Sequence, residues 1–129
     1  MEIITEWIVN KDEIDSMDHV NNCVYVSYLE KARKDWYLAA GASKQSLRER
    51  DLGTVVLKLD ILFRKEARLG EHLWIKTCNY QLGNKSFILK QDVLNEDGDI
   101  ITEAKVTSVM FDRIQRKSTK VATEITKWF

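Results

Sequence analysis

Alternating apolar and polar positions predict a β-strand at the N-terminus, and a helical spacing predicts one long helix after it. Residues 2–9 alternate with a period of two, as in a strand that buries one face. Further on, apolar residues recur at a spacing of three and four up to Gly41, which offers a helix stop. Asn21 and Asn22 both offer an N-cap at the other end. The pattern therefore predicts a helix over residues 22–40.

The second half of the chain has the pattern of four β-strands joined by short turns. Apolar residues alternate with polar ones within each strand, and glycine-containing turns separate the strands. The clearest turn is Asn-Glu-Asp-Gly at residues 95–98, because Asp-Gly readily adopts the positive φ that hairpins need. Consecutive strands joined by hairpins form an antiparallel sheet. The predicted strands are residues 55–63, 73–80, 86–94 and 100–111, with the other turns at Gly70 and at Gly83-Asn84.

These elements predict an α+β fold in which an antiparallel sheet wraps around one long central helix. A helix with one apolar face must be buried, and the sheet is the only large element available to cover it. No linker or repeat divides the chain, so we expect a single domain over residues 1–129. On the far side of the sheet we expect Val56 and Leu62 beside Lys58 and Asp60. This apolar surface favours a partner subunit.

Composition excludes several classes of protein. A hydrophobic fraction of 44% in 129 residues is enough for a core that needs neither disulfides nor metal. Twenty basic and twenty acidic side chains leave no net charge, so no overall field attracts nucleic acid or an anionic membrane. The N-terminus is acidic and lacks the apolar region of a signal peptide, and no run reaches the roughly 20 apolar residues of a membrane helix. With only Cys23 and Cys78, far apart in sequence, we expect free thiols in the cytoplasm.

The loop that leads into the helix carries the candidate chemistry. The first N–H groups of a helix are unpaired and lie at the positive end of its dipole, where they can stabilise an oxyanion. A carboxylate just before that helix can act as a general base or as a nucleophile. Asp15 has this position, and His19 lies between it and the helix.

This segment resembles the signature of hot-dog thioesterases, in particular the 4-hydroxybenzoyl-CoA thioesterase-like and acyl-ACP thioesterase-like proteins. The similar residues are D-x-x-x-H-V-N-N-x-x-Y over 15–25 and Y-L-E-x-A-R over 28–33, with segments 60–71, 84–87 and 95–106 in the same order. The resemblance implies a hot-dog fold that hydrolyses an acyl thioester of CoA or of acyl carrier protein. It also implies a homodimer or homotetramer with active sites between subunits, and no metal or redox cofactor.

The resemblance also assigns roles to individual residues. Asp15 aligns with the catalytic aspartate, acting as base or as nucleophile, and His19 aligns with a histidine of the acyl-ACP thioesterase pattern. The backbone N–H at Asn22 aligns with the donor that polarises the thioester carbonyl. The chain departs from the pattern at Met17, where relatives carry asparagine, and at Asp18, where many carry glycine. We expect substrate contacts from Asn21, Tyr25, Arg64, Lys85 and Ser86, with Lys85 meeting the CoA phosphates.

Simpler interpretations stay open for several of these residues. Asp15 and His19 suit a purely structural turn, Asn21 suits a helix cap, and Tyr25 suits the core. Cys23 is expected to be buried and unreactive, although it follows His19 at a spacing that permits a Cys–His pair. The spacing of the histidines and cysteines fits no standard zinc site. At the level of function, the alternatives are a hot-dog hydratase or dehydratase and a non-catalytic acyl-thioester binding module.

Overall fold

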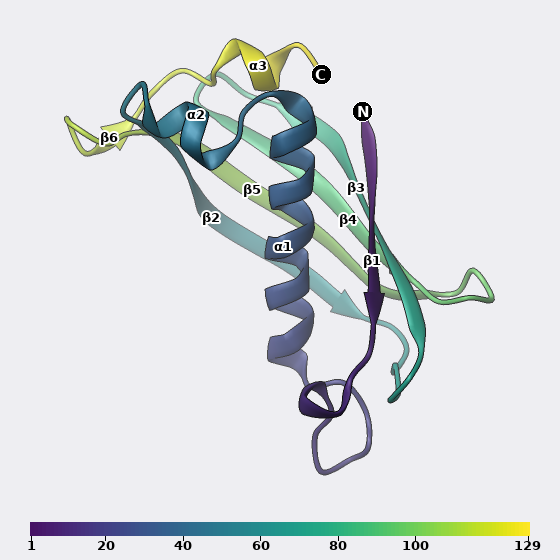
Figure 1. The fold of residues 1–129 in the computed structure, drawn as a ribbon. Helices are drawn as coiled ribbons and strands as arrows, with labels where there is room; N and C mark the ends of the chain where they lie inside the picture. Colours follow the sequence, from purple (N-terminus) through teal and green to yellow (C-terminus); the bar gives the residue numbers. More distant parts are fainter.

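The computed structural model describes residues 1–129 and contains the predicted long helix against an antiparallel sheet (Figure 1). Helix α1 spans Asn22–Ala40, which confirms the predicted bounds. The five long strands are β1 (Glu2–Ile8), β2 (Leu52–Phe63), β3 (His72–Leu82), β4 (Ser86–Leu94) and β5 (Ile100–Asp112). Shorter elements, which the sequence did not predict, are the 3-10 helix η1 (Lys11–Glu13), α2 (Lys44–Arg48), β6 (Lys117–Ser118) and α3 (Thr123–Thr126).

Local sequence sets both ends of α1. The side chain of Asn21 accepts a hydrogen bond from the Cys23 N–H, so Asn21 is the N-cap and Asn22 is the first helical residue. At the other end Gly41 adopts a left-handed conformation with φ of 82°, and its N–H bonds to the carbonyl of Leu38. Glycine adopts this conformation without the steric cost that a Cβ would add.

The strand order is β1-β3-β4-β5-β2, which corrects one inference from the sequence. The turn at Gly70 does not join neighbouring strands, because β2 pairs with β5 and β3 pairs with β1. The connection between β2 and β3 instead passes from β2, at one edge of the sheet, to β3, which lies beside the opposite edge strand β1. It is bonded to the end of β1 through Val9 and the residues at 70 and 71. Helix α1 lies across one face of this sheet and contacts β1 and β3 (Figure 1), while β2 contributes the partly buried Leu59 and Ile61 to the core.

A β-bulge at Leu57 changes which residues of β2 face the helix. The register shifts between Val56 and Lys58, so Leu59 and Ile61 pack against the core while Leu57 is exposed. Val56 lines a cavity beside α1 and does not share the outer face with Leu62, contrary to the uninterrupted alternation expected from the sequence.

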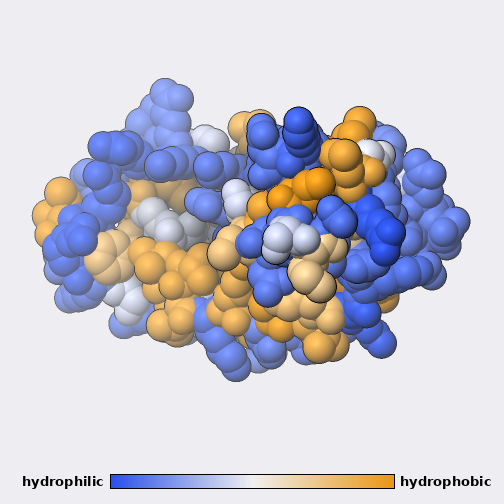
Figure 2. Space-filling view, turned by 90° about the horizontal axis from the view of Figure 1, so that it is seen from below, coloured by the Kyte–Doolittle hydropathy of each residue, from blue (hydrophilic) through white to orange (hydrophobic).

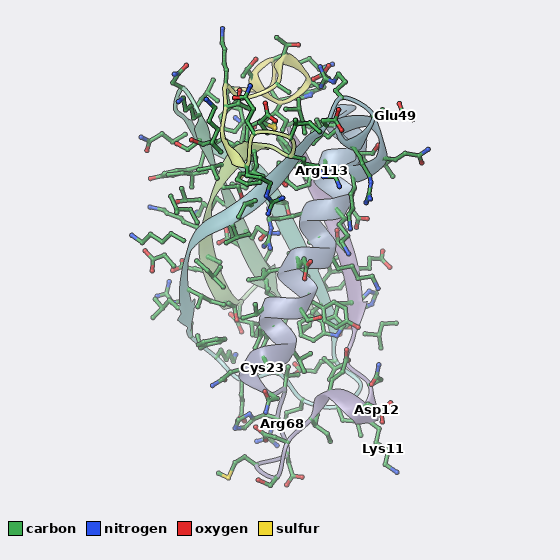
Figure 3. The ribbon with its side chains drawn as sticks, turned by 90° about the vertical axis from the view of Figure 1, so that its left-hand side faces the viewer. Lys11, Asp12, Cys23, Glu49, Arg68 and Arg113 are labelled. Carbon is green, nitrogen blue, oxygen red and sulfur yellow. The ribbon has the colours of Figure 1, made fainter.

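The core consists of two clusters stacked along α1. The first surrounds Trp7, Tyr25 and Leu29 near the helix start, and the second surrounds Trp36 and Phe87 near its end. Figure 3 shows the two ends of the molecule, with Cys23 and Arg68 at the first and Glu49 and Arg113 at the second. We call the first the loop end and the second the α2 end. None of the helices is long and apolar enough to cross a membrane.

Candidate active site

Residues 14–20 form a tight, hairpin-like loop directly before α1. Ile14 and Val20 form a β-bridge at its base, and the Asp15 N–H donates to the His19 carbonyl at 2.9 Å. Asp18 lies at the tip with φ of 64°, a left-handed conformation that favours glycine. This explains why glycine suits the same position in the thioesterase pattern, and aspartate is among the residues that tolerate the conformation best.

The Asp15 carboxylate is partly fixed and partly free. Its Oδ1 accepts a hydrogen bond from the Met17 N–H at 2.9 Å and lies 3.9 Å from Nδ1 of His19. Its Oδ2 has no hydrogen-bond partner within the chain, and the side chain is 27% exposed. One oxygen is therefore held by the loop while the other can receive a proton or approach a substrate.

The start of α1 offers an unused N–H donor close in sequence to this carboxylate. The Asn21 side chain satisfies the Cys23 N–H, and the Val24 N–H bonds to the Asn21 carbonyl. The Asn22 N–H takes part in none of the backbone hydrogen bonds outside the regular elements. It is one of the orphan donors at the positive end of the helix dipole, as the sequence predicted.

Glu13 links the loop to β1 through hydrogen bonds, a role that the sequence analysis did not predict. Its side chain is 9% exposed and accepts hydrogen bonds from Trp7 Nε1 at 3.0 Å and from the Asn10 N–H at 2.8 Å. Its backbone carbonyl also accepts the Asn21 N–H. Burial acts to raise the pKa of Glu13, but the hydrogen bonds from Trp7 and Asn10 lower it below its usual value. Polar spacing alone gave no sign that this carboxylate is buried.

A family model described as the thioesterase-like superfamily matches residues 9–129. The chain belongs to this family. It is 33% identical to the long-chain acyl-CoA thioesterase FadM of Escherichia coli K12, over 94% of this chain and 92% of FadM. It is 26% identical to the acyl-CoA thioester hydrolase YbgC of Escherichia coli, over 82% of this chain and 79% of YbgC.

Solved structures confirm the hot-dog fold predicted for this member of the thioesterase-like superfamily. A Staphylococcus aureus protein in complex with CoA superimposes with a TM-score of 0.93 at 16% identity, over 99% of this chain and 81% of that one. Identity at this level shows a shared fold. The family assignment itself comes from the matched model and from the similarity to FadM.

The predicted substrate-contacting residues of this thioesterase-like chain lie at both ends of the molecule. Arg64, just after β2, lies at the loop end and is paired with Glu103 at 3.0 Å. Lys85 and Ser86 lie at the turn between β3 and β4, at the α2 end, so one chain does not bring them to Asp15. Lys85 is exposed and, unlike Arg64, has no ion-pair partner.

Tyr25 is a core residue, which agrees with the simpler of its two interpretations. It is 4% exposed and packs edge-on against Trp7, with ring centroids 5.5 Å apart. Burial raises the pKa of Tyr25 to about 12, so its hydroxyl stays protonated at neutral pH and does not serve as a base.

The expectation that Cys23 is buried is wrong. Its side chain is exposed, because it occupies the first turn of α1 on the face that points away from the sheet. His19 Nδ1 is directed instead toward the Val20 carbonyl, at 3.4 Å, and toward Asp15. No hydrogen bond joins the Cys23 thiol to His19, so the geometry does not support a Cys–His pair.

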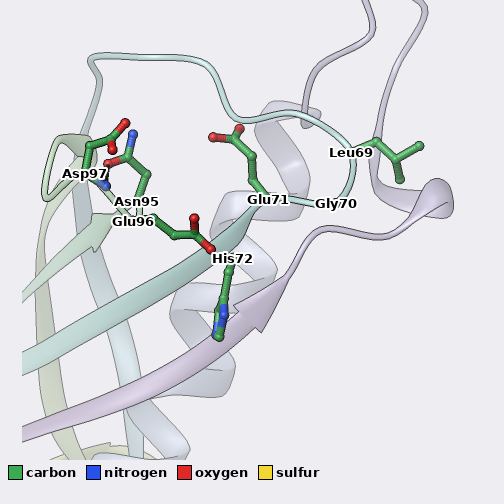
Figure 4. A pocket seen from close by; sticks show the side chains of 7 residues that line it. All are labelled: Leu69, Gly70, Glu71, His72, Asn95, Glu96 and Asp97. Atoms are coloured by element: carbon green, nitrogen blue, oxygen red, sulfur yellow. Dashed lines mark hydrogen bonds between the residues drawn. The ribbon is translucent and has the colours of Figure 1, made fainter.

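Two open cavities lie at opposite ends of the molecule, and neither is lined by Asp15, His19 or Asn22. The smaller, of about 380 Å³, lies at the loop end between the start of β3 and the turn before β5 (Figure 4). Its lining is polar and acidic, and the His72 ring points away from the Glu71 carboxylate. The larger, of about 640 Å³, lies at the α2 end between α1, α2 and β2. No three His, Cys, Asp or Glu side chains are grouped to hold a metal ion.

Proposed function

We propose that this protein hydrolyses acyl-CoA thioesters with Asp15 as its catalytic carboxylate. The observation that carries the proposal is the unpaired Oδ2 of Asp15, in a loop that ends at the unpaired N–H of Asn22. Thioester hydrolysis is the activity for which FadM and YbgC are named, and their names also support CoA, rather than a carrier protein, as the thiol. The cytoplasmic location stays a prediction.

In the proposed reaction the Asn22 N–H donates to the thioester oxygen, where negative charge develops during attack. Asp15 either takes a proton from water as the water oxygen bonds to the acyl carbon, or bonds to that carbon itself. The carbon–sulfur bond then breaks and CoA leaves as the thiol. In the second route, water hydrolyses the resulting anhydride. Both routes give one carboxylic acid and one CoA, and neither needs a metal or redox cofactor. His19 acts through Asp15, as a positioning residue 3.9 Å from its carboxylate.

We also propose that two copies assemble through β2, the edge strand whose outer side has no partner in the sheet. Unpaired edge strands in monomeric proteins are usually short or charged, because they otherwise recruit another chain. Strand β2 has twelve residues and exposes apolar side chains, including Leu57 at 69% and Leu62 at 55%. Viewed from the loop end, apolar surface extends across the lower middle of the view and reaches its lower edge, with mostly hydrophilic surface above it (Figure 2).

Such a dimer would complete the site. Helix α1 runs antiparallel to β2, since Tyr25 near its start contacts Phe63 and Tyr37 near its end contacts Thr54. Pairing two β2 strands about a two-fold axis reverses one relative to the other. The loop end of one subunit then faces the α2 end of its partner, which carries the large cavity. Lys85 of the partner subunit, distant from Asp15 within one chain, would approach the CoA of the shared site.

A thiol-release assay over a panel of acyl-CoAs tests this function. We expect Asp15→Asn to lower kcat by roughly a hundredfold or more, because it removes the base or nucleophile. Cys23→Ala is the matched control and should retain activity. Crotonyl-CoA hydration tests the hydratase alternative in the same preparations. Full turnover by a correctly folded Asp15→Asn protein would reject the proposal, and tight acyl-CoA binding without turnover would favour a binding module.

A further inference from the structure

The large cavity at the α2 end has the character of an anion-binding site. It lies between the second half of α1, α2 and β2, and its lining combines apolar side chains with charged and hydroxyl-bearing ones. Basic side chains outnumber acidic ones there by five to two. The acidic residues are Glu30 and Asp35, and the basic ones are Arg33, Lys34, Lys44, Arg48 and Arg113.

Arg33 differs from the other basic residues of the cavity because it is buried. It is 8% exposed, yet no carboxylate lies within 4 Å of its guanidinium. It makes a single side-chain hydrogen bond, from Nη1 to Oε1 of Gln91 at 2.9 Å, and otherwise lines the cavity. A guanidinium carries five N–H donors, so most of its capacity is unused within the chain.

The residue behind Arg33 is fully engaged and holds it in place. Gln91 is completely buried, and its Nε2 donates to the Leu29 carbonyl at 3.0 Å and to Thr77 Oγ1 at 2.9 Å. Its Oε1 is therefore fixed toward Arg33. Burial lowers the pKa of Arg33, although the charge of Glu30 acts to raise it, because a cation is costly to keep out of water without a direct ion pair. A buried cation with a fixed orientation and free donors is best satisfied by an anion that enters the cavity.

Hydroxyl groups complete the polar wall beside Arg33. Tyr37, Thr54 and Ser108 all line the cavity. Burial raises the pKa of Tyr37, while the nearby hydroxyls of Thr54 and Ser108 and the charge of Arg33 act to lower it. The Tyr37 hydroxyl is therefore close to Arg33 and stays protonated. Such a wall offers hydrogen bonds to oxygen atoms of a ligand, beside the apolar side chains that line the rest of the cavity.

We propose that Arg33 binds a carboxylate at the far end of the acyl group, so that the preferred substrates are acyl thioesters with a terminal anionic group. This inference rests on the proposed function and on the β2 dimer, in which the cavity of one subunit faces the Asp15 loop of the other. The thioester then lies at the partner's loop, and the acyl group extends into the cavity. A CoA phosphate is the other possible source of anionic oxygens, and the experiment separates the two.

The test compares adipoyl-CoA with hexanoyl-CoA, and suberoyl-CoA with octanoyl-CoA, as matched pairs. Each pair shares CoA and chain length and differs in the terminal carboxylate. We expect wild-type protein to prefer the carboxylate-ended member, and Arg33→Gln to reduce that preference in kcat/KM by roughly tenfold or more. Arg33→Lys should keep part of it, and Lys31→Gln, which removes one charge from the solvent-exposed face of α1, should keep all of it.

Two results would overturn the inference. If Arg33→Gln lowers kcat/KM equally for both members of a pair, Arg33 contacts CoA or serves only the structure. If wild-type protein prefers hexanoyl-CoA and the variant does too, the cavity holds a neutral chain. Calorimetric titration with adipate and with hexanoate keeps this test separate from catalysis. Adipate binding that is lost in Arg33→Gln supports the site even if no thioester is hydrolysed, and equal adipate binding by a folded variant rejects it.

Discussion

At the scale of single residues, the loop before α1 depends on a buried carboxylate that takes no part in the chemistry. Glu13 joins β1 to the loop through Trp7 and receives the Asn10 N–H, and its backbone carbonyl receives the N–H of the cap residue, Asn21. The aspartate that we propose as catalytic lies two residues later. The position of Asp15 therefore depends on a group that only the folded structure reveals.

Glu13→Gln should lower the free energy of unfolding by about 1 kcal/mol at pH 7, because a neutral amide accepts these hydrogen bonds more weakly. Folding lowers the pKa of Glu13. Its ionised form therefore stabilises the fold at pH values above the unfolded pKa, and this stabilisation is lost as the pH falls through the folded pKa. Urea titrations at neutral pH and near pH 3 should show that the difference in unfolding free energy between wild type and variant becomes smaller in acid. A gap of equal size at both pH values would contradict this account.

At the scale of elements, the sequence predicted α1 correctly because its ends carry local signals. Asn21 caps the first turn and Gly41 takes the left-handed conformation that ends the last one. The partner of β2 could not be predicted in this way, since strand pairing depends on contacts between distant segments. The bulge at Leu57 has no local signal either, and it moved Val56 from the expected outer face to the cavity.

The same reasoning applies to the candidate site. Asp15, His19 and Asn22 are close in sequence, so a motif was enough to group them in one loop and helix start. Arg33 is far from them along the chain, and what singles it out is burial without a direct ion pair. A basic residue in a charged stretch of helix is usually solvent-exposed, and the sequence showed nothing that set this one apart.

Replacing the helix cap should weaken both stability and catalysis. Asn21→Ala removes the acceptor for the Cys23 N–H, so we expect a loss of about 1 kcal/mol in unfolding free energy. Because the cap also orders the first turn, which presents the Asn22 N–H, we expect kcat to fall with it. Asn21→Ser keeps a capping oxygen and should recover most of both losses in thermal melts and thiol-release assays. If Asn21→Ala loses stability but keeps full kcat, the helix start is not the oxyanion donor.

At the scale of the whole molecule, the unpaired side of β2 should control assembly. Leu57→Glu places a charge on this exposed edge strand and should yield monomers in sedimentation velocity experiments, with most thioesterase activity lost. Ile4→Glu is the matched control, because Ile4 is exposed at 53% on β1, the opposite edge of the sheet. A dimer that survives Leu57→Glu and dissociates with Ile4→Glu would assign the interface to β1 instead.

Sharing of one active site between two subunits can be tested by mixing inactive variants. In the β2 dimer, Asp15 of each site comes from one subunit and Lys85 from the other. A mixed dimer of Asp15→Asn and Lys85→Ala subunits therefore contains one site with both residues intact and one with neither. If subunits mix at random, about a quarter of wild-type activity should return at low acyl-CoA concentration, where the loss of Lys85 matters most. If each chain instead forms its own complete site, the mixture will show no more than the average of the two separate activities. That result would reject the proposal that CoA binds between the subunits.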